Sequence, residues 1–98
     1  MHKYILIGKN SQQTAASMLN KPQNRKELNK PLFEVFNVKV IEFLYFNHPE
    51  FDTLVTIEAE SDEIVSAACN LVYASGSFNS FTWFRAFEAD EWKDIYQT

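Results

Sequence analysis

The chain has 98 residues, of which 46% are hydrophobic and 15% aromatic, so it can build one folded core and is not intrinsically disordered. Its formal charge is −4, from 9 basic and 13 acidic residues, which disfavours non-specific binding to nucleic acid or to an anionic membrane. The one cysteine, Cys69, excludes an internal disulfide and a thiolate zinc site, and we expect it to be a small buried side chain.

The first third of the chain predicts one strand and one interrupted helical region. The short apolar run at residues 4–7 is typical of a buried strand. Residues 12–36 show apolar side chains at helical spacing. Pro31 lies inside this pattern, and because proline has no amide hydrogen and crowds the preceding turn, we expect a break near residues 29–30.

The remaining chain predicts a hairpin, a helix, a strand and a short final helix. Residues 38–46 are rich in β-branched and aromatic side chains, and the turn-forming residues 47–50 separate them from a second strand at residues 51–58. Further along, the pattern indicates a helix from Ser61 to about Gly76, a strand at residues 78–87 and a helix at residues 89–96.

The order β-α-β-β-α-β indicates a ferredoxin-like α+β fold, with a four-stranded antiparallel sheet, helices on one face, and an added C-terminal helix. We find no repeat and no linker, so we expect residues 1–98 to form a single domain.

Both faces of this sheet carry large apolar side chains, because strand residues alternate between the two faces. In the strand at residues 38–46 one face has Ile41, Phe43 and Tyr45, and the other has Val40, Glu42, Leu44 and Phe46. Helices cover only one face, so a monomer would expose a large apolar patch on the other. We therefore predict a homodimer in which two sheets pack face to face about a two-fold axis; the sequence leaves open which face forms this contact.

Two polar residues near the hairpin turn are candidate catalytic groups. His48 lies in the turn and Asp52 follows four residues later. A histidine oriented by a carboxylate can act as a general base near neutral pH. The structural alternatives are a solvated turn histidine and an aspartate that binds its own backbone.

Four further residues are candidates for ligand binding. Tyr4, Tyr45 and Trp83 combine an apolar ring with a polar tip, which suits a cavity for a flat or apolar small molecule between sheet and helices. Arg85 could clamp such a ligand, or it could form an ion pair within the sheet or stack on a ring. Plain core packing is the alternative for the three aromatic residues.

Strong catalytic and cofactor motifs are absent from the sequence. It has no phosphate-binding glycine loop, no nucleophile elbow and no zinc-protease helix, and its two histidines and one cysteine are widely spaced. We therefore expect no metal, no cofactor, and neither nucleic acid nor membrane as a partner. The absence of a signal-peptide core or a transmembrane run predicts a cytoplasmic location.

The stretch Asp-Thr-Leu-Val-Thr-Ile-Glu-Ala at residues 52–59, followed by Ser-Asp-Glu at 61–63, resembles the part of the GYD family that ends in Glu-Ala-Pro-Asp-Asp-Glu. Lys3 and Tyr4 near the start and residues 85–87 near the end also fit that family. Where the family has Gly, this chain has Pro49. Where the family has Tyr-Asp, this chain has Phe51 followed by the retained Asp52, and Glu60 takes the place of the family's Pro.

This resemblance implies a ferredoxin-like subunit that pairs sheet to sheet in a dimeric α/β-barrel. It implies no assigned reaction, because the wider group includes cofactor-free oxygenases, haem-handling enzymes, isomerases and small-ligand sensors.

Three functional hypotheses follow. The first is a dimer that binds a small apolar or aromatic ligand. The second is a non-catalytic interaction or regulatory module. The third is a cofactor-independent enzyme of the oxygenase or isomerase type, with His48 or Asp52 as the base. A closed cavity above roughly 300 Å³ favours the first or third hypothesis over the second.

Overall fold

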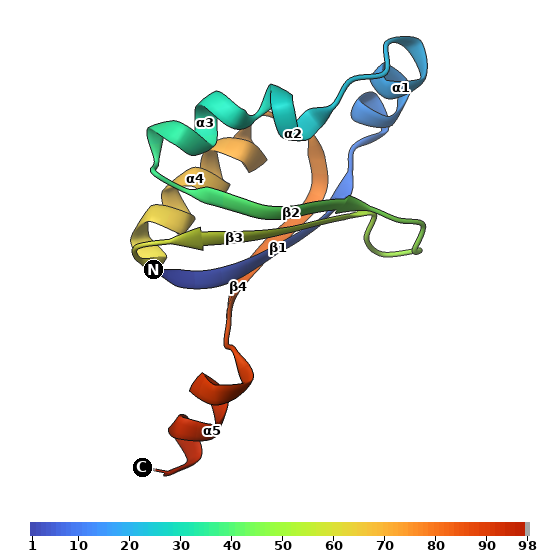
Figure 1. Ribbon diagram of the computed structural model, residues 1–98. Coiled ribbons are helices and arrows are strands. Elements are labelled where there is room, and N and C mark those ends of the chain that lie inside the picture. Colours follow the sequence, from blue (N-terminus) through green and yellow to red (C-terminus); the bar gives the residue numbers. More distant parts are fainter. Residues whose placement is uncertain (98) are drawn as a thin grey trace.

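A four-stranded antiparallel sheet with the strand order β2-β3-β1-β4 forms the centre of the protein (Figure 1). This structure is a computed structural model, and it describes residues 1–97. The strands are β1 (His2–Asn10), β2 (Lys39–Tyr45), β3 (Thr53–Ala59) and β4 (Phe78–Ala86). The helices are α1 (Gln12–Asn20), α2 (Arg25–Leu28), α3 (Lys30–Val35), α4 (Asp62–Ala74) and α5 (Ala89–Gln97). The predicted ferredoxin-like α+β fold with an added C-terminal helix is confirmed.

Helices α2, α3 and α4 lie on one face of the sheet, which we call the helix-covered face (Figure 1). The core lies between these helices and the sheet, where apolar side chains become almost inaccessible to water. Cys69 on α4 is buried within it, as the sequence predicted. The core residues are Tyr4, Leu6, Phe33, Val38, Val55, Ile57, Ala59, Val65 and Cys69.

Local sequence signals set the ends of α4. The Ser61 hydroxyl accepts a hydrogen bond from the amide of Ile64, and two acidic residues occupy the first turn, where the helix dipole favours negative charge. Beyond the other end, Gly76 has a φ angle of +78°, a conformation that costs glycine little. These signals place α4 directly after β3, so its apolar side folds back onto the sheet.

The helical region before β2 is broken where proline predicted it. α2 ends at Leu28 and α3 begins at Lys30, with Pro31 in the first turn of α3. Proline is tolerated there because amides of a first turn have no partner within the helix. The break divides the region into short helices, of which α3 supplies one buried core residue, Phe33.

Among residues 1–97, no helix lies alongside the opposite face of the sheet, which we call the open face (Figure 1). Strand pairing arranges its side chains in rows that cross all four strands. One central row is Leu44, Leu54, Ile7 and Thr82, and the next is Glu42, Thr56, Ile5 and Phe84. The row at the end of the sheet is Lys39, Glu58, Lys3 and Ala86. The open face is therefore apolar in its middle, with alternating charges at one end.

The sequence prediction that side chains of β2 alternate strictly between the two faces of the sheet is wrong at the start of the strand. Residue pairing shifts between Val40 and Glu42, so Val40 pairs with Ile57 and packs against the core. Ile41, which the sequence placed beside Phe43, is 41% exposed. The physical reason is a bulge-type irregularity, which inserts one residue into the strand and reverses the face of those before it.

Helix α5 extends away from the rest of the molecule, on the open-face side of the sheet (Figure 1). It gives the protein an elongated outline of 52 × 31 × 19 Å. At its base, Lys3 forms an ion pair with Glu88, and Arg85 lies 3.9 Å from the Glu91 carboxylate. None of the helices formed by residues 1–97 is both long and apolar enough to cross a membrane.

Candidate functional site

The turn between β2 and β3 forms a shallow hollow of about 390 Å³. The two predicted catalytic residues both line it, because the turn brings the end of β2 and the start of β3 together. Its lining residues are Lys9, Phe46, Asn47, His48, Pro49 and Asp52.

The His48 side chain is engaged by its own turn. Its Nδ1 atom accepts a hydrogen bond of 3.0 Å from the backbone amide of Glu50, and its ring stacks on Phe51 with the centroids 6.0 Å apart. While Nδ1 accepts this bond it carries no proton, so the ring proton of His48 lies on Nε2. His48 therefore has a structural part in the turn, beside any chemistry of the hollow.

Asp52 connects the turn to the end of β1. Its Oδ1 accepts hydrogen bonds from the Asn10 amide at 2.9 Å and from the Thr53 hydroxyl at 3.1 Å. Its Oδ2 lies 3.9 Å from the Lys9 ammonium, which also donates to the His48 carbonyl at 3.4 Å. The carboxylate thus faces Asn10 and Lys9. A general base at His48 or Asp52 stays a prediction. Both side chains line one hollow, and each accepts a hydrogen bond from a backbone amide.

A second region with candidate sites lies between β2 and the helices that precede it. A hollow of about 610 Å³, which we call the Tyr45 hollow, has a floor of aromatic rings from β2 and a wall from the segment that contains α2. Its lining residues are Met18, Pro22, Gln23, Asn24, Arg25, Lys26, Phe43 and Tyr45.

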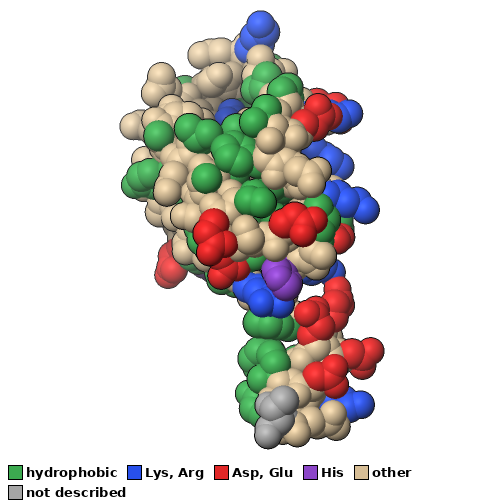
Figure 2. Space-filling model, turned by 90° about the vertical axis from the view of Figure 1, so that its left-hand side faces the viewer, with side chains coloured by type: hydrophobic (Ala, Val, Ile, Leu, Met, Phe, Trp, Pro, Cys, Tyr) green, Lys and Arg blue, Asp and Glu red, His purple; other side chains and the backbone are tan. Residues whose placement is uncertain are grey.

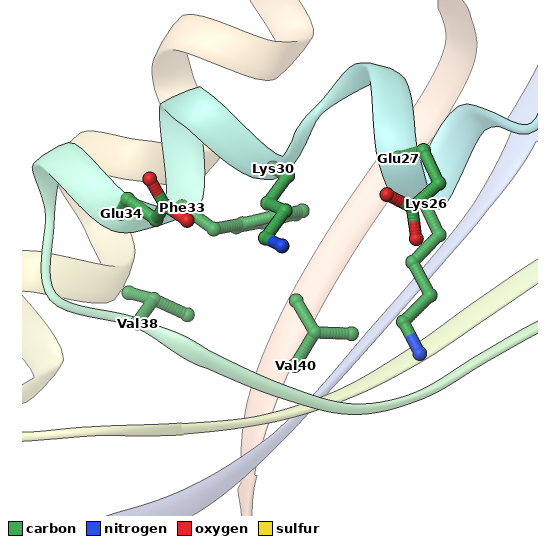
Figure 3. A pocket seen from close by; sticks show the side chains of 7 residues that line it. All are labelled: Lys26, Glu27, Lys30, Phe33, Glu34, Val38 and Val40. Carbon is green, nitrogen blue, oxygen red and sulfur yellow. The ribbon is translucent and has the colours of Figure 1, made fainter.

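Its neighbour, which we call the Phe33 hollow, has a volume of about 350 Å³ and shares Lys26 with the first (Figure 3). In Figure 3, Val38 and Val40 point up from β2, while Lys26 and Lys30 reach down from the helices. Its lining residues are Lys26, Glu27, Lys30, Phe33, Glu34, Val38 and Val40.

The chemistry of the Tyr45 hollow combines an apolar floor with positive charge. The rings of Tyr45 and Phe43 are 5.4 Å apart and tilted by 45°. Burial raises the pKa of the Tyr45 phenol above its ordinary value, the Arg25 charge opposes this rise, and Asp52 adds to it. The phenol therefore stays neutral and can donate a hydrogen bond, while Arg25 and Lys26 can attract an anion.

Two of the predicted aromatic residues lie elsewhere. Tyr4 is fully buried, and its ring meets Trp83 edge-on with the centroids 5.9 Å apart. The Tyr4 hydroxyl donates a hydrogen bond of 2.5 Å to Asp62, at the start of α4. Burial, together with this bond and the Asp62 charge, raises the pKa of Tyr4 to about 12. Tyr4 thus tethers α4 to β1 within the core.

Trp83 borders a separate small hollow of about 260 Å³ between β4 and α4. It packs partly buried against the core, so most of its role in the structure is that of a core aromatic. The other residues that line this hollow are Cys69, Asn70, Tyr73, Phe81 and Thr82.

Arg85 lies at the opposite end of the sheet from the hairpin turn. It pairs with Tyr4 across the strands, whereas the turn adjoins Gly8, whose carbonyl accepts the Asp52 amide at 3.0 Å. The Arg85 guanidinium lies over the Phe87 ring, 4.8 Å from its centroid. The structure therefore brings His48 and Asp52 together, places Tyr45 in another hollow, and sets Arg85 beside Tyr4 on the neighbouring strand, with Trp83 against the Tyr4 ring.

The sequence interpretation missed the residues that accompany Tyr45. Phe43 could have been found, because it precedes Tyr45 by two residues and shares its face of the strand. The adjacent cations Arg25 and Lys26 carry a weaker signal, since nothing local shows that α2 folds over β2. Within residues 1–97 we find no group of three or more histidine, cysteine, aspartate or glutamate side chains that could hold a metal ion.

The sequence matches the family model of the GYD domain over residues 4–96, which is nearly its whole length. No curated protein matches it. The family match agrees with the resemblance carried by residues 52–63 and with the ferredoxin-like architecture. The chain therefore belongs to the GYD domain family.

Proposed function

We propose that the protein binds a small apolar or aromatic molecule in the Tyr45 hollow and does so as a homodimer formed through the open face. The observation that carries the ligand site is the hollow itself. Its volume of about 610 Å³ falls within the range of roughly 300–1,000 Å³ that is usual for small-molecule sites, and it lies between sheet and helices.

The lining of the Tyr45 hollow indicates the kind of ligand. Phe43 and Tyr45 offer ring faces for a flat apolar body, and the phenol of Tyr45 offers one hydrogen bond. Arg25 and Lys26 favour a ligand that carries a carboxylate or another negative group. An aromatic or aliphatic acid therefore suits this lining better than a neutral hydrocarbon or a cation.

The dimer is supported by the side chains of the open face. Leu44 is 46% exposed and Phe84 is 47% exposed, and partly exposed Ile5, Ile7 and Leu54 lie between them in the central rows. Because such a continuous patch on a monomer favours association, a second copy is a simple way to remove it from water. Charges at the end of the sheet would form the rim of that interface.

The ligand site can be tested with 2-naphthoate as the probe, followed by amide chemical shifts in ¹H–¹⁵N spectra. We expect saturable shifts around Arg25, Phe43 and Tyr45, and a dissociation constant at least about tenfold weaker in Tyr45→Ala. Tyr73→Ala is a matched control, since Tyr73 is 52% exposed against 48% for Tyr45 but lies on α4. Shifts that avoid α2 and β2, or an equal loss in both variants, would contradict the proposed site.

The dimer can be tested by light scattering at low micromolar concentration. We expect a mass near twice the 11.4 kDa of the chain. A mass equal to that of one chain, unchanged as the concentration rises, would contradict the dimer and leave the ligand site to be judged separately.

A second candidate, a cofactor-independent oxygenase or isomerase, rests on one observation. His48 and Asp52 line the same hollow of about 390 Å³, which is large enough for a small substrate. A proton-transfer role predicts that His48→Gln abolishes hydrogen–deuterium exchange of a weakly acidic carbon in a bound probe such as 2-naphthylacetate. Exchange at the rate seen without protein would remove this alternative.

A further inference from the structure

Helix α5 is amphipathic, and about half or more of the surface of each large side chain on its apolar side is exposed to solvent. Trp92, Ile95 and Tyr96 recur at helical spacing and are 51%, 47% and 75% exposed. The Trp92 ring lies against two rings of the same segment, those of Phe87 and Tyr96. Figure 2 shows hydrophobic side chains along one side of the projecting arm and acidic side chains along the other. An arm of this pattern gains most of its stability by packing on another surface.

The arm leaves the sheet at a defined place. Lys39, the first residue of β2, and Ala86, the last residue of β4, lie in the same row across the four strands. α5 therefore departs from the end of the sheet at which β2 begins, and it extends to the open-face side (Figure 1). In the proposed dimer, that is the side on which the second copy lies.

A two-fold axis parallel to the strands puts unlike edges of the two sheets together. In a sheet ordered β2-β3-β1-β4, such an axis places β4 of one copy beside β2 of the other and keeps the same end of both sheets together. The arm that follows β4 then emerges beside the β2 edge of the second copy, near the start of that strand. The Phe33 hollow opens at this end of β2 on the helix-covered face, since Val38 and Val40 form its lower wall, so the arm reaches it by passing the β2 edge.

The Phe33 hollow can accept the arm. Its apolar part comes from the partly buried Val40 and from the small accessible areas of Phe33 and Val38, and the nearby Ile41 is 41% exposed at the strand edge. Glu27 and Glu34 also line it, so its own charges balance against Lys26 and Lys30. The wider segment of residues 21–30 is basic, with four basic and one acidic side chain, whereas residues 88–97 have four acidic and one basic. These opposite charges favour the approach of the arm to this segment.

We propose that α5 is an exchanged arm, whose apolar side packs into the Phe33 hollow of a second copy of the chain. This inference rests on the proposed dimer and adds to it the contact between the edges and the orientation of the two-fold axis. It also gives each Phe33 hollow an occupant, which leaves the adjoining Tyr45 hollow as the site for a small ligand.

Cysteine cross-linking between two different variants tests the exchange. Ile95→Cys places a thiol on the apolar side of the arm, and Lys30→Cys places one at the exposed rim of the hollow. The native Cys69 does not compete, because it is buried and burial raises its pKa to about 12. After the two variants are mixed and mildly oxidised, we expect a disulfide between the two chains, identified by mass spectrometry of the joined peptides.

Asp94→Cys is the matched control, since residue 94 lies one position from Ile95 on the polar side of the helix. We expect it to cross-link to Lys30→Cys at least about fivefold less. A chain truncated after Glu88 should dimerise with a dissociation constant raised at least about tenfold.

The outcomes separate the two proposals. A protein that is dimeric by light scattering but cross-links equally through residues 94 and 95, or through neither, overturns the exchanged arm and leaves the dimer in place. A protein that is monomeric by light scattering overturns both.

Discussion

The two faces of the sheet have similar shares of apolar residues and very different environments. Along β3, Thr53, Val55 and Ile57 point to the helix-covered face and are buried, whereas Leu54 and Thr56 point to the open face and remain partly exposed. The buried face has few charges, and the open face ends in a row of lysines and a glutamate. The alternation of apolar residues therefore shows only that both faces of the strand can pack against something. The charged residues at the end of the open face distinguish a face suited to an interface from the face that forms the interior.

The adjacent residues Phe43 and Leu44 give the sharpest test of this difference. Phe43→Asp removes a ring that packs against the core and puts a partly desolvated carboxylate in its place, so it should lower the free energy of unfolding by about 3 kcal/mol. Leu44→Asp changes the open face and should leave a folded monomer. Urea unfolding with light scattering distinguishes them, and equal losses of stability would erase the contrast between the faces.

Truncation on neighbouring residues of β3 extends the test. Ile57 is 1% exposed, so Ile57→Ala should cost about 3 kcal/mol of stability through lost burial and a residual cavity. Leu54→Ala, on the open face, should change the unfolding midpoint mainly through the dimer, and therefore in a manner that depends on protein concentration. The comparison fails if Leu54→Ala destabilises the protein as much as Ile57→Ala at every concentration.

The close packing of the helix-covered face is also tested at Gly8. A Cβ atom added there would lie 2.8 Å from the Ser80 carbonyl and 2.9 Å from the Phe81 ring. Gly8→Ala should therefore cost about 2 kcal/mol, as overpacking does. Gly76→Ala has open space around it but a φ angle of +78°, so about 1 kcal/mol is expected from the backbone alone. Thermal unfolding of both variants should rank them in this order.

The smallest effect concerns the tether between β1 and α4. Tyr4→Phe removes the hydrogen bond to Asp62 and should cost about 1 kcal/mol near neutral pH. Since folding raises the pKa of Tyr4 from 10.0 to about 12, its protonated form stabilises the fold fully below pH 10, and this contribution is lost as the pH rises to about 12. The stability difference between the native chain and Tyr4→Phe should vary over this range; a constant difference would contradict the buried phenol.

Much of the fold follows from local physical chemistry and could be predicted from the sequence. Pro31 cannot continue a helix, Ser61 and two acidic residues begin α4, and the turn-forming residues 47–50 lie within the connection between β2 and β3, which spans residues 46–52. Each of these signals acts over a few residues, so it is the same in the unfolded and folded chain. For that reason the element order, and with it the ferredoxin-like fold, required no tertiary information.

The candidate site depended on distances that no local signal contains. His48 and Asp52 could be paired because a short turn joins them, but Arg85 and Tyr45 were separated by the register of β1 with its two neighbours. The bulge near Ile41 reversed the face of Val40, and the fold of α2 over β2 brought Arg25 to Tyr45. Strand register, bulges and helix docking arise from the packing of many side chains at once, so only the tertiary structure decided them.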